Sequence, residues 1–478
     1  ETINVSISNA SNASISDPTG QISISDNDGL NKGTSLTYTS STATSLAAEA
    51  EFEVLGNGTS GYNTGTNQSV QNPFEIANFH KAAAYGLTGS GKQIAVVDSG
   101  YDFSHVELDT VTGTVYGNIT AATGVNVSQD HGNFVTGIMV AENNGIGVQG
   151  VAYNSTLHVS DYSQKGGETY FANHWANLTN DASSAVVQNN SWGYSNDTLT
   201  TVQNYMSSNS ASATTATAYY YSQAGGTSNE ASVTNQITAL NNFQNHGVIV
   251  WANSNSNLTD ADLHSGLPVL FPDLNEAWIT AVNINAKGAS GSETYAIIGA
   301  QCGQAAEFCM GADGWGIKGL GDANFTWNDS GGTSFSAPQI SGAVALLAEA
   351  FPNQTPAQWT DRLLASANNN LGFTQDGVTT FGNGVEHGYS SEAGHGFLDV
   401  YAALQPITSN SYARSIYAGS SNLDGQRYDL TRTAIGTSRS FGDGLFNSLS
   451  SEANYFYDAM GGGFKYNMSN HVVSSSES

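Results

Sequence analysis

Basic residues are scarce in this sequence. Its 478 residues include 12 Lys and Arg against 40 Asp and Glu, which gives a formal net charge of −28 at pH 7. Such an excess of negative charge repels the phosphate backbone of nucleic acids, so we expect no nucleic-acid partner. The composition suits a soluble surface or secreted protein, and clustered carboxylates could bind calcium in a structural role.

Long apolar runs are lacking as well. No stretch approaches the roughly 20 apolar residues that a membrane-spanning helix needs. Residue 1 is Glu, and neither the basic start nor the apolar core of a signal peptide follows it. We therefore expect no membrane span in this chain, while a signal peptide could have been removed before its first residue.

Metal-binding and phosphate-binding motifs are also missing. The ten histidines include no His-Glu-x-x-His arrangement, and no group of Cys and His has the spacing of a zinc site. The glycine-rich stretch 461–463 is not followed by the Lys of a phosphate-binding loop. The sequence therefore supplies no ligands for a metallohydrolase, and we expect no metal in the site.

Cysteine is limited to two residues, Cys302 and Cys309. In an oxidising compartment a disulfide between them would close a short loop and add about 2–3 kcal/mol of stability through loop entropy. A pair of free cytosolic thiols is the alternative.

Three segments carry the residues of a nucleophilic site. The segment 332–338 places Ser334 on a glycine-led turn in front of an apolar helical pattern, where helix N–H groups lie close to developing negative charge. The apolar run 93–97 predicts a buried parallel strand, and Asp98 follows at its carboxyl end. His131 begins a segment, 131–142, with a helical apolar pattern.

These three side chains have complementary chemistry. A serine hydroxyl is a poor nucleophile until a base takes its proton, and an imidazole base needs a carboxylate to fix its tautomer and stabilise its charged form. Each motif alone is more often an ordinary turn or strand end. Their occurrence together in the order Asp98, His131, Ser334 predicts a catalytic triad, and we interpret the other nine histidines as structural or surface residues.

The three motifs together resemble those of the subtilisin-like serine proteases, the subtilases, over about residues 74–407. The resemblance implies a serine endopeptidase that forms an acyl-enzyme, acts on protein or peptide substrates and requires no cofactor. Two positions depart from the family pattern. Asn133 stands where the histidine motif usually has Thr, and Asp313 stands where Pro is common.

The resemblance also implies an oxyanion donor and a substrate-binding edge. The register of the apolar strand 247–252 assigns the donor role to Asn255, with the Ser334 N–H as second donor, and leaves Asn253 as a competitor. For the substrate-binding edge, the alternative interpretation is an ordinary strand end that has no role in binding. An apolar side chain is expected before the scissile bond, although Asn253 leaves the pocket chemistry open. The implied substrate-binding residues are Ser191, Trp192, Gly193, Ala252, Asn253 and Ser254.

Strand-like and helix-like runs alternate through the catalytic region, which predicts an α/β fold with a doubly wound, mostly parallel sheet flanked by helices. The span 195–231 is rich in Ser, Ala and Thr and is predicted to be a loop. The expected strands are 93–97, 156–160, 185–189, 247–252 and 277–282, and the expected helices are 131–142, 232–245, 335–350 and 356–367.

The two ends differ from this region. Residues 1–29 alternate apolar and polar and resemble the end of a Calx-beta module, 30–73 form a predicted linker, 74–407 the peptidase domain, and 408–478 a linker or tail. The segment 302–309, with its cysteine pair, and the tail are similar to parts of autotransporter-type secreted bacterial subtilases. These resemblances imply a secreted or cell-surface protein that is part of a longer polypeptide.

A different function stays open at this point. The chain could be a catalytically weak or inactive subtilase-fold module that serves adhesion or binding in a larger surface protein. The presence of Asp98, His131 and Ser334 counts against this alternative, because a decayed site usually loses one of its catalytic groups.

Overall fold

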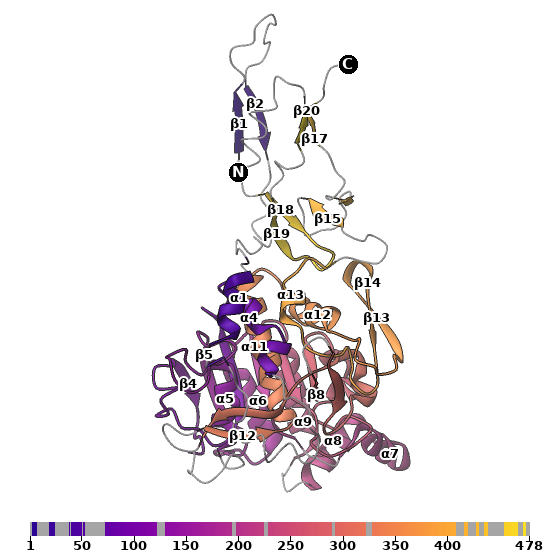
Figure 1. Cartoon of the computed structure of the whole chain (residues 1–478). Coiled ribbons are helices and arrows are strands. Elements are labelled where there is room, and N and C mark those ends of the chain that lie inside the picture. The colour runs from indigo at the N-terminus through magenta and orange to yellow at the C-terminus, as the bar shows by residue number, and fades with distance from the viewer. Residues whose placement is uncertain are drawn as a thin grey trace, which may run out of the picture.

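A computed structural model describes residues 2–6, 19–23, 38, 40–49, 51–52, 72–121, 130–193, 197–223, 228–288, 292–321, 327–407, 415–418, 427–429, 435–437, 454–466 and 472–474. The part between residues 72 and 407 forms an α/β body in which helices cover both faces of a central sheet (Figure 1).

The central sheet is mostly parallel, as the sequence predicts. Its strands are β3 (Gln93–Asp98), β4 (Gly113–Tyr116), β5 (Thr156–Asp161), β6 (Val187–Asn190), β7 (Val248–Ala252), β8 (Trp278–Lys287), β9 (Thr294–Ile297) and β10 (Cys309–Ala312). Their order is β10-β8-β7-β6-β3-β5-β4, with β9 antiparallel to β8. β3 lies between β5 and β6, so the chain runs from β3 to β5 on one side of it and then returns past β3 to β6 on the other. Crevices form at the carboxyl ends of the strands at such a switch point.

Helices are interspersed with the strands along the chain. They are α1 (Ser40–Ala47), α3 (Pro73–Ile76), α4 (Phe79–Ala83), α5 (His131–Val140), α6 (Phe171–Asp181), α7 (Leu199–Asn209), α8 (Ala213–Gln223), α9 (Glu230–Phe243), α10 (Leu267–Leu270), α11 (Thr333–Ala350), α12 (Pro356–Ser366) and α13 (Val400–Ala403). Three short 3-10 helices are η1 (Pro272–Leu274), η2 (Gly303–Phe308) and η3 (Gly382–Gly384) among the described residues. Among the described residues, no helix is both long enough and apolar enough to cross a bilayer.

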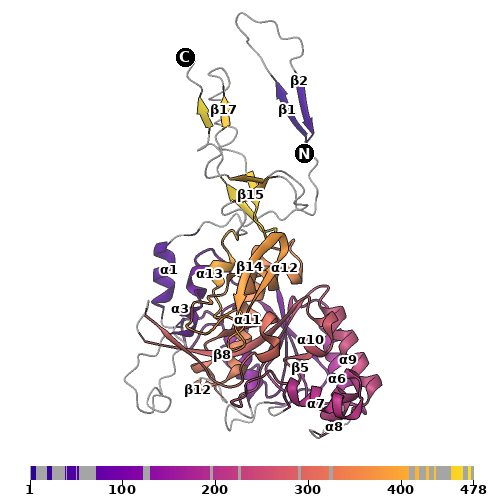
Figure 2. The ribbon, with the colours of Figure 1, turned by 90° about the vertical axis from the view of Figure 1, so that its right-hand side faces the viewer.

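The apolar strand β3 accounts for the helices on both faces. Ile94 and Val96 belong to the hydrophobic cluster that includes α5 and α11, whereas Ala95 and Val97 belong to the cluster that includes α6 and α9. Successive side chains of a strand point to opposite faces, so an all-apolar strand needs cover on both sides. Figure 2 shows α6 and α9 together on one side of the body and α11 on the other side of the sheet.

The span 195–231 differs from its prediction as a loop, because it contains α7 and α8. Few of their residues are buried, and their many Ser and Thr residues leave no clear helical spacing of apolar residues in the sequence. Aromatic contacts hold the pair together, with the Tyr205 and Tyr219 rings stacked at a centroid distance of 4.2 Å.

Shorter elements surround the body. Antiparallel pairs are β11 (Trp315–Leu320) with β12 (Trp327–Gly331) and β13 (Gly377–Phe381) with β14 (Val385–Tyr389). Within 1–29, β1 (Thr2–Ser6) and β2 (Thr19–Ser23) form a hairpin, and the predicted linker 30–73 contains α1. Within 408–478 lie β15 (Ser415–Ala418), β16 (Arg427–Asp429), β17 (Ile435–Thr437), β18 (Asn454–Tyr457), β19 (Gly463–Tyr466) and β20 (Val472–Ser474). The domain limits drawn from the sequence stay predictions, and much of 1–73 and 408–478 lies outside the described residues.

One disulfide and one buried ion pair fix the carboxyl-terminal part of the body. Cys302 and Cys309 are joined by a disulfide. Arg362 of α12 is fully buried and donates to the Asp458 carboxylate at 2.8 Å, and it also donates to the carbonyl of Ala403. Asp458 lies beyond residue 407, so part of the predicted tail packs against the α/β body.

Removal of the Asp458 carboxylate is expected to destabilise the protein strongly. The variant Asp458→Ala leaves the buried Arg362 guanidinium without its counter-charge, which costs about 3–5 kcal/mol. Chemical denaturation, carried out in a Ser334→Ala background to prevent self-digestion, measures the change. The exposed acid Asp273 supplies the control, since Asp273→Asn should change the free energy of unfolding by no more than about 0.5 kcal/mol. Equal stabilities for both variants would contradict this role of the ion pair.

Candidate active site

Asp98 is buried at the carboxyl end of β3, at the switch point of the sheet. Its side chain is 1% exposed, and its Oδ1 accepts a hydrogen bond from the Ser99 N–H at 2.8 Å. The preceding apolar residues fill the strand, so the carboxylate is the first polar side chain to emerge at the sheet edge. A buried carboxylate needs hydrogen-bond donors to compensate for its lost hydration.

His131 supplies the second donor. It is the first residue of α5, and its Nδ1 lies 2.8 Å from Asp98 Oδ1. The backbone N–H of Gly132 donates to the Ser99 carbonyl, which ties the start of α5 to the turn after β3. A Cβ atom on Gly132 would lie 2.9 Å from that carbonyl oxygen, so glycine permits this close approach.

The electrostatics of His131 follow from this contact. Burial alone would lower the pKa of His131, but the charge of Asp98 and its hydrogen bond outweigh burial and raise the pKa above its usual value. The hydrogen bond to Nδ1 also directs Nε2 away from Asp98. The imidazole is therefore oriented and prepared to take up a proton.

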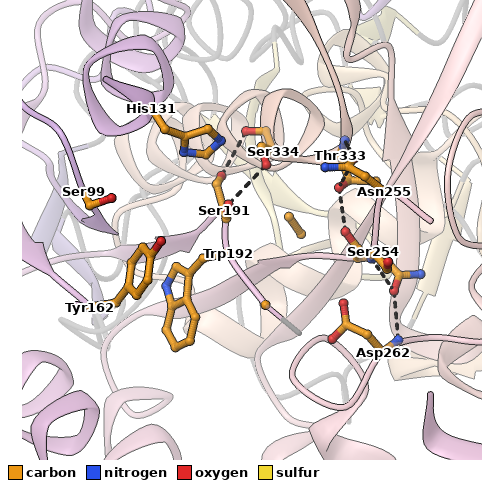
Figure 3. Close-up of a pocket in the computed structure, with 13 residues that line it drawn as sticks. Ser99, His131, Tyr162, Ser191, Trp192, Ser254, Asn255, Asp262, Thr333 and Ser334 are labelled. Atoms are coloured by element: carbon orange, nitrogen blue, oxygen red, sulfur yellow. Dashed lines mark hydrogen bonds between the residues drawn. The ribbon is translucent and has the colours of Figure 1, made fainter. Parts of the chain in front are cut away.

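Ser334 is the second residue of α11 and lines the same cavity as His131. The two helices meet where Phe134 packs on Phe335 with ring centroids 4.5 Å apart. The His131 ring lies 5.7 Å from the Phe335 ring, so the histidine is beside the residue that follows Ser334. Figure 3 shows His131 and Ser334 side by side.

A reciprocal pair of hydrogen bonds fixes Ser334 to the end of β6. The Ser334 hydroxyl donates to the Ser191 carbonyl at 3.1 Å, and the Ser191 hydroxyl donates to the Ser334 carbonyl at 2.9 Å (Figure 3). The second bond has a sequence cause. Pro338 lies inside α11 and has no N–H to donate to the carbonyl four residues earlier, which is that of Ser334.

The structure distinguishes Asn253 from Asn255, the two candidates for the oxyanion donor. The buried Asn253 donates its side-chain amide to the Gln301 carbonyl at 2.8 Å, and its Oδ1 accepts from the Asp262 N–H at 3.0 Å. The exposed Asn255 instead accepts with its Oδ1 from the N–H of Thr333 at 2.9 Å. This leaves the amide nitrogen of Asn255 as the end of the side chain available to the cavity.

All the substrate-binding residues expected from the sequence line one cavity of about 310 Å³. Figure 3 shows it between the Trp192 side and the Ser254 side. The sequence interpretation missed four further lining residues. Tyr162 directly follows β5, and its position at a strand end could have revealed it, whereas nothing in the local sequence singles out Asp262. The missed residues are Ser99, Tyr162, Asp262 and Thr333.

The two departures from the family pattern have structural partners. Asn133 donates its amide to the Gly321 carbonyl at 3.0 Å. Asp313 is buried, and its carboxyl accepts from the backbone N–H groups of Ala286 and Trp315. Burial raises the pKa of Asp313 to about 7. Both side chains therefore satisfy nearby backbone groups and leave the cavity unobstructed.

Comparison with known proteins agrees with this fold. Subtilisin E of Bacillus subtilis (strain 168) is 26% identical over 344 residues, which cover 71% of this chain and 72% of that protein. An extracellular serine protease of Serratia marcescens is 24% identical over 326 residues, 58% of this chain and 29% of that protein. A crystal structure of a serine protease of Aeromonas sobria has the same fold, with a TM-score of 0.52 at 18% identity over 82% of this chain and 75% of that one.

A family model described as the subtilase family matches residues 89–396, which is well over half of the sequence. The match includes Asp98, His131 and Ser334 as well as the whole central sheet. The chain therefore belongs to the subtilase family.

Proposed function

We propose that this subtilase is a serine endopeptidase that hydrolyses peptide bonds through an acyl-enzyme. The observation that carries the proposal is the 2.8 Å contact between Asp98 and His131 at the cavity that Ser334 also lines. A carboxylate, an imidazole and a hydroxyl in this arrangement are the groups that nucleophilic acyl transfer requires.

The proposed reaction begins when the Ser334 hydroxyl turns from the Ser191 carbonyl toward His131. His131 takes the hydroxyl proton as Ser334 Oγ attacks the scissile carbonyl, and Asp98 stabilises the imidazolium that forms. His131 then gives that proton to the leaving amine. A water molecule, activated in the same way, hydrolyses the acyl-enzyme and restores the Ser334 hydroxyl.

Negative charge on the substrate carbonyl oxygen would be stabilised by two donors. One is the amide nitrogen of Asn255, whose oxygen is held by Thr333. The other is the Ser334 N–H in the first turn of α11, where helix N–H groups have no partner four residues earlier. A substrate in extended form would pair with the backbone of residues 191–193, as a strand added to an edge.

Substrate and location follow from the same assignment. We propose protein or peptide substrates and a secreted or cell-surface location, which the extracellular relative from Serratia marcescens and the disulfide between Cys302 and Cys309 support. The autotransporter-type relationship, the Calx-beta remnant and membership of a longer polypeptide stay proposals. The alternative, an inactive adhesion module, is opposed by the intact Asp98–His131 contact.

A structural calcium ion also stays a prediction. Among the described residues, no group of three or more His, Cys, Asp or Glu side chains could hold a metal ion. A calcium site in this part of the chain would therefore draw mostly on backbone and amide oxygens, which calcium accepts as ligands. The proposed catalytic steps use no metal.

Labelling with a fluorophosphonate tests the proposed function. The reagent should form a covalent adduct on Ser334 in the wild type, because His131 activates that hydroxyl. Peptide mapping by mass spectrometry locates the adduct. Ser334→Ala should give none, whereas the control Ser207→Ala, at an exposed position on α7, should label like the wild type. A folded wild-type protein that forms no adduct would refute the active-protease proposal.

Separate replacement of the two asparagines tests the oxyanion assignment. Asn255→Ala should lower kcat by about 10²–10³-fold, because one transition-state hydrogen bond is lost. Asn253→Ala should mainly lower thermal stability, because its buried amide bonds are lost. Rates are measured per labelled active site so that misfolded protein is not counted. A larger loss of kcat in Asn253→Ala would reverse the assignment.

A further inference from the structure

A buried acid lies at the cavity far from the catalytic histidine. Asp262 is 1% exposed, yet it is among the residues that line the cavity. Figure 3 shows Ser334 and Asp262 on opposite sides of the cavity, with the Asp262 carboxyl directed into the space between Trp192 and Ser254. The Asp262 N–H donates to Asn253, which fixes this residue to the end of β7.

The two carboxyl oxygens of Asp262 have different surroundings. Oδ1 accepts the backbone N–H groups of His264 at 2.8 Å and Ser265 at 2.9 Å, which sets the orientation of the carboxyl. Oδ2 faces Gly193 on the opposite wall, where a Cβ atom would lie 3.4 Å from it. Because residue 193 is glycine, no side chain fills the space in front of this oxygen.

The energetics of Asp262 favour a positively charged ligand. Burial raises the pKa of Asp262 to about 7, although hydrogen bonds from Ser265 and His264 oppose the shift, and the nearby charge of Asp197 adds to it. These neighbours are neutral donors and a second acid, so they bring no positive charge to compensate the carboxylate. A cation in the cavity would do so and would supply donors to Oδ2.

Asp313 provides a useful contrast within the same protein. It is also buried, and its pKa is also raised to about 7. Protein donors reach both of its oxygens, since Trp315 N–H donates to Oδ1 and Ala286 N–H to Oδ2. Asp313 does not line the substrate cavity, whereas Asp262 presents one oxygen to it.

We propose that Asp262 makes this enzyme selective for substrates with Arg or Lys on the amino-terminal side of the scissile bond, the P1 position. The inference rests on the proposed function, since the walls formed by 191–193 and 252–254 would receive the P1 side chain. The aliphatic stem of Arg or Lys packs along the walls while its cationic end reaches Oδ2. This departs from the apolar P1 side chain expected from the sequence, because that expectation took no account of Asp262.

A purely structural role is the competing explanation. Asp262 could serve only to bind the N–H groups of the turn that follows it. Asp262→Asn separates the two roles, because an Asn side chain keeps an acceptor oxygen and nearly the same shape but loses the negative charge. The turn is preserved in this variant, and only the attraction for a cation is removed.

Hydrolysis of matched peptides tests the proposal. Substrates that differ only at P1, with Arg, Lys, Phe or Leu, are compared by kcat/KM per fluorophosphonate-labelled site. The wild type should favour Arg and Lys by at least about tenfold, and Asp262→Asn should lower kcat/KM for Arg by about 30-fold or more while Phe changes by less than about threefold. Asp273→Asn, an exposed acid on η1, controls for a general loss of charge.

Two outcomes would overturn the proposal. One is equal wild-type hydrolysis of the Arg and Phe peptides, and the other is the same proportional loss for every peptide in Asp262→Asn. The second would indicate a structural role. Both outcomes leave the proposed protease function intact, because peptides are still cleaved.

A binding measurement decides the role of Asp262 even without turnover. The cationic probe p-aminobenzamidine is titrated by fluorescence into folded Ser334→Ala protein and into the double variant Ser334→Ala, Asp262→Asn. Saturable binding that weakens at least about tenfold in the double variant supports the cation site. Absence of binding, or equal binding to both proteins, overturns it. A protein that binds the probe through Asp262 but cleaves no peptide would overturn only the proposed function.

Discussion

The contact between Asp98 and His131 is the interaction on which the rest of the site depends. A buried carboxylate at the end of β3 is costly unless donors compensate it, and the donors come from the Ser99 N–H and the first residue of α5. The compensation has two results at once. It fixes α5 against the sheet, and it orients the imidazole toward the cavity with a raised pKa.

A second constraint joins the proposed nucleophile to the substrate-binding edge. Pro338 frees the Ser334 carbonyl from helix hydrogen bonding, and the Ser191 hydroxyl donates to it. The edge that would hold the peptide and the helix that carries the serine are therefore held in one register. The two ends of the cavity present different chemical groups. The imidazole of His131 and the hydroxyl of Ser334 lie at one end, and the carboxyl of Asp262 lies at the other (Figure 3).

The sequence predicts the features that are encoded locally. The apolar run before Asp98 and the glycine-led turn before Ser334 mark their elements directly, and the predicted sheet and its flanking helices are confirmed. The helices α7 and α8 were not predicted because their many small polar residues leave no clear helical spacing of apolar residues. Asp262 was missed for another reason. Its place in the cavity results from the fold of the loop after β7, which brings its carboxyl opposite Gly193, and a single sequence does not show that these two residues meet.

The most direct test of the coupling between Asp98 and His131 is an NMR titration of His131 in Ser334→Ala protein, with and without Asp98→Asn. The pKa of His131 should lie above about 6.5 when Asp98 is present, because the charge of Asp98 outweighs burial. In Asp98→Asn protein the burial remains but the charge is gone, so the pKa should fall below about 6.5. A His131 pKa that is the same in both proteins would contradict the coupling on which the proposed mechanism rests.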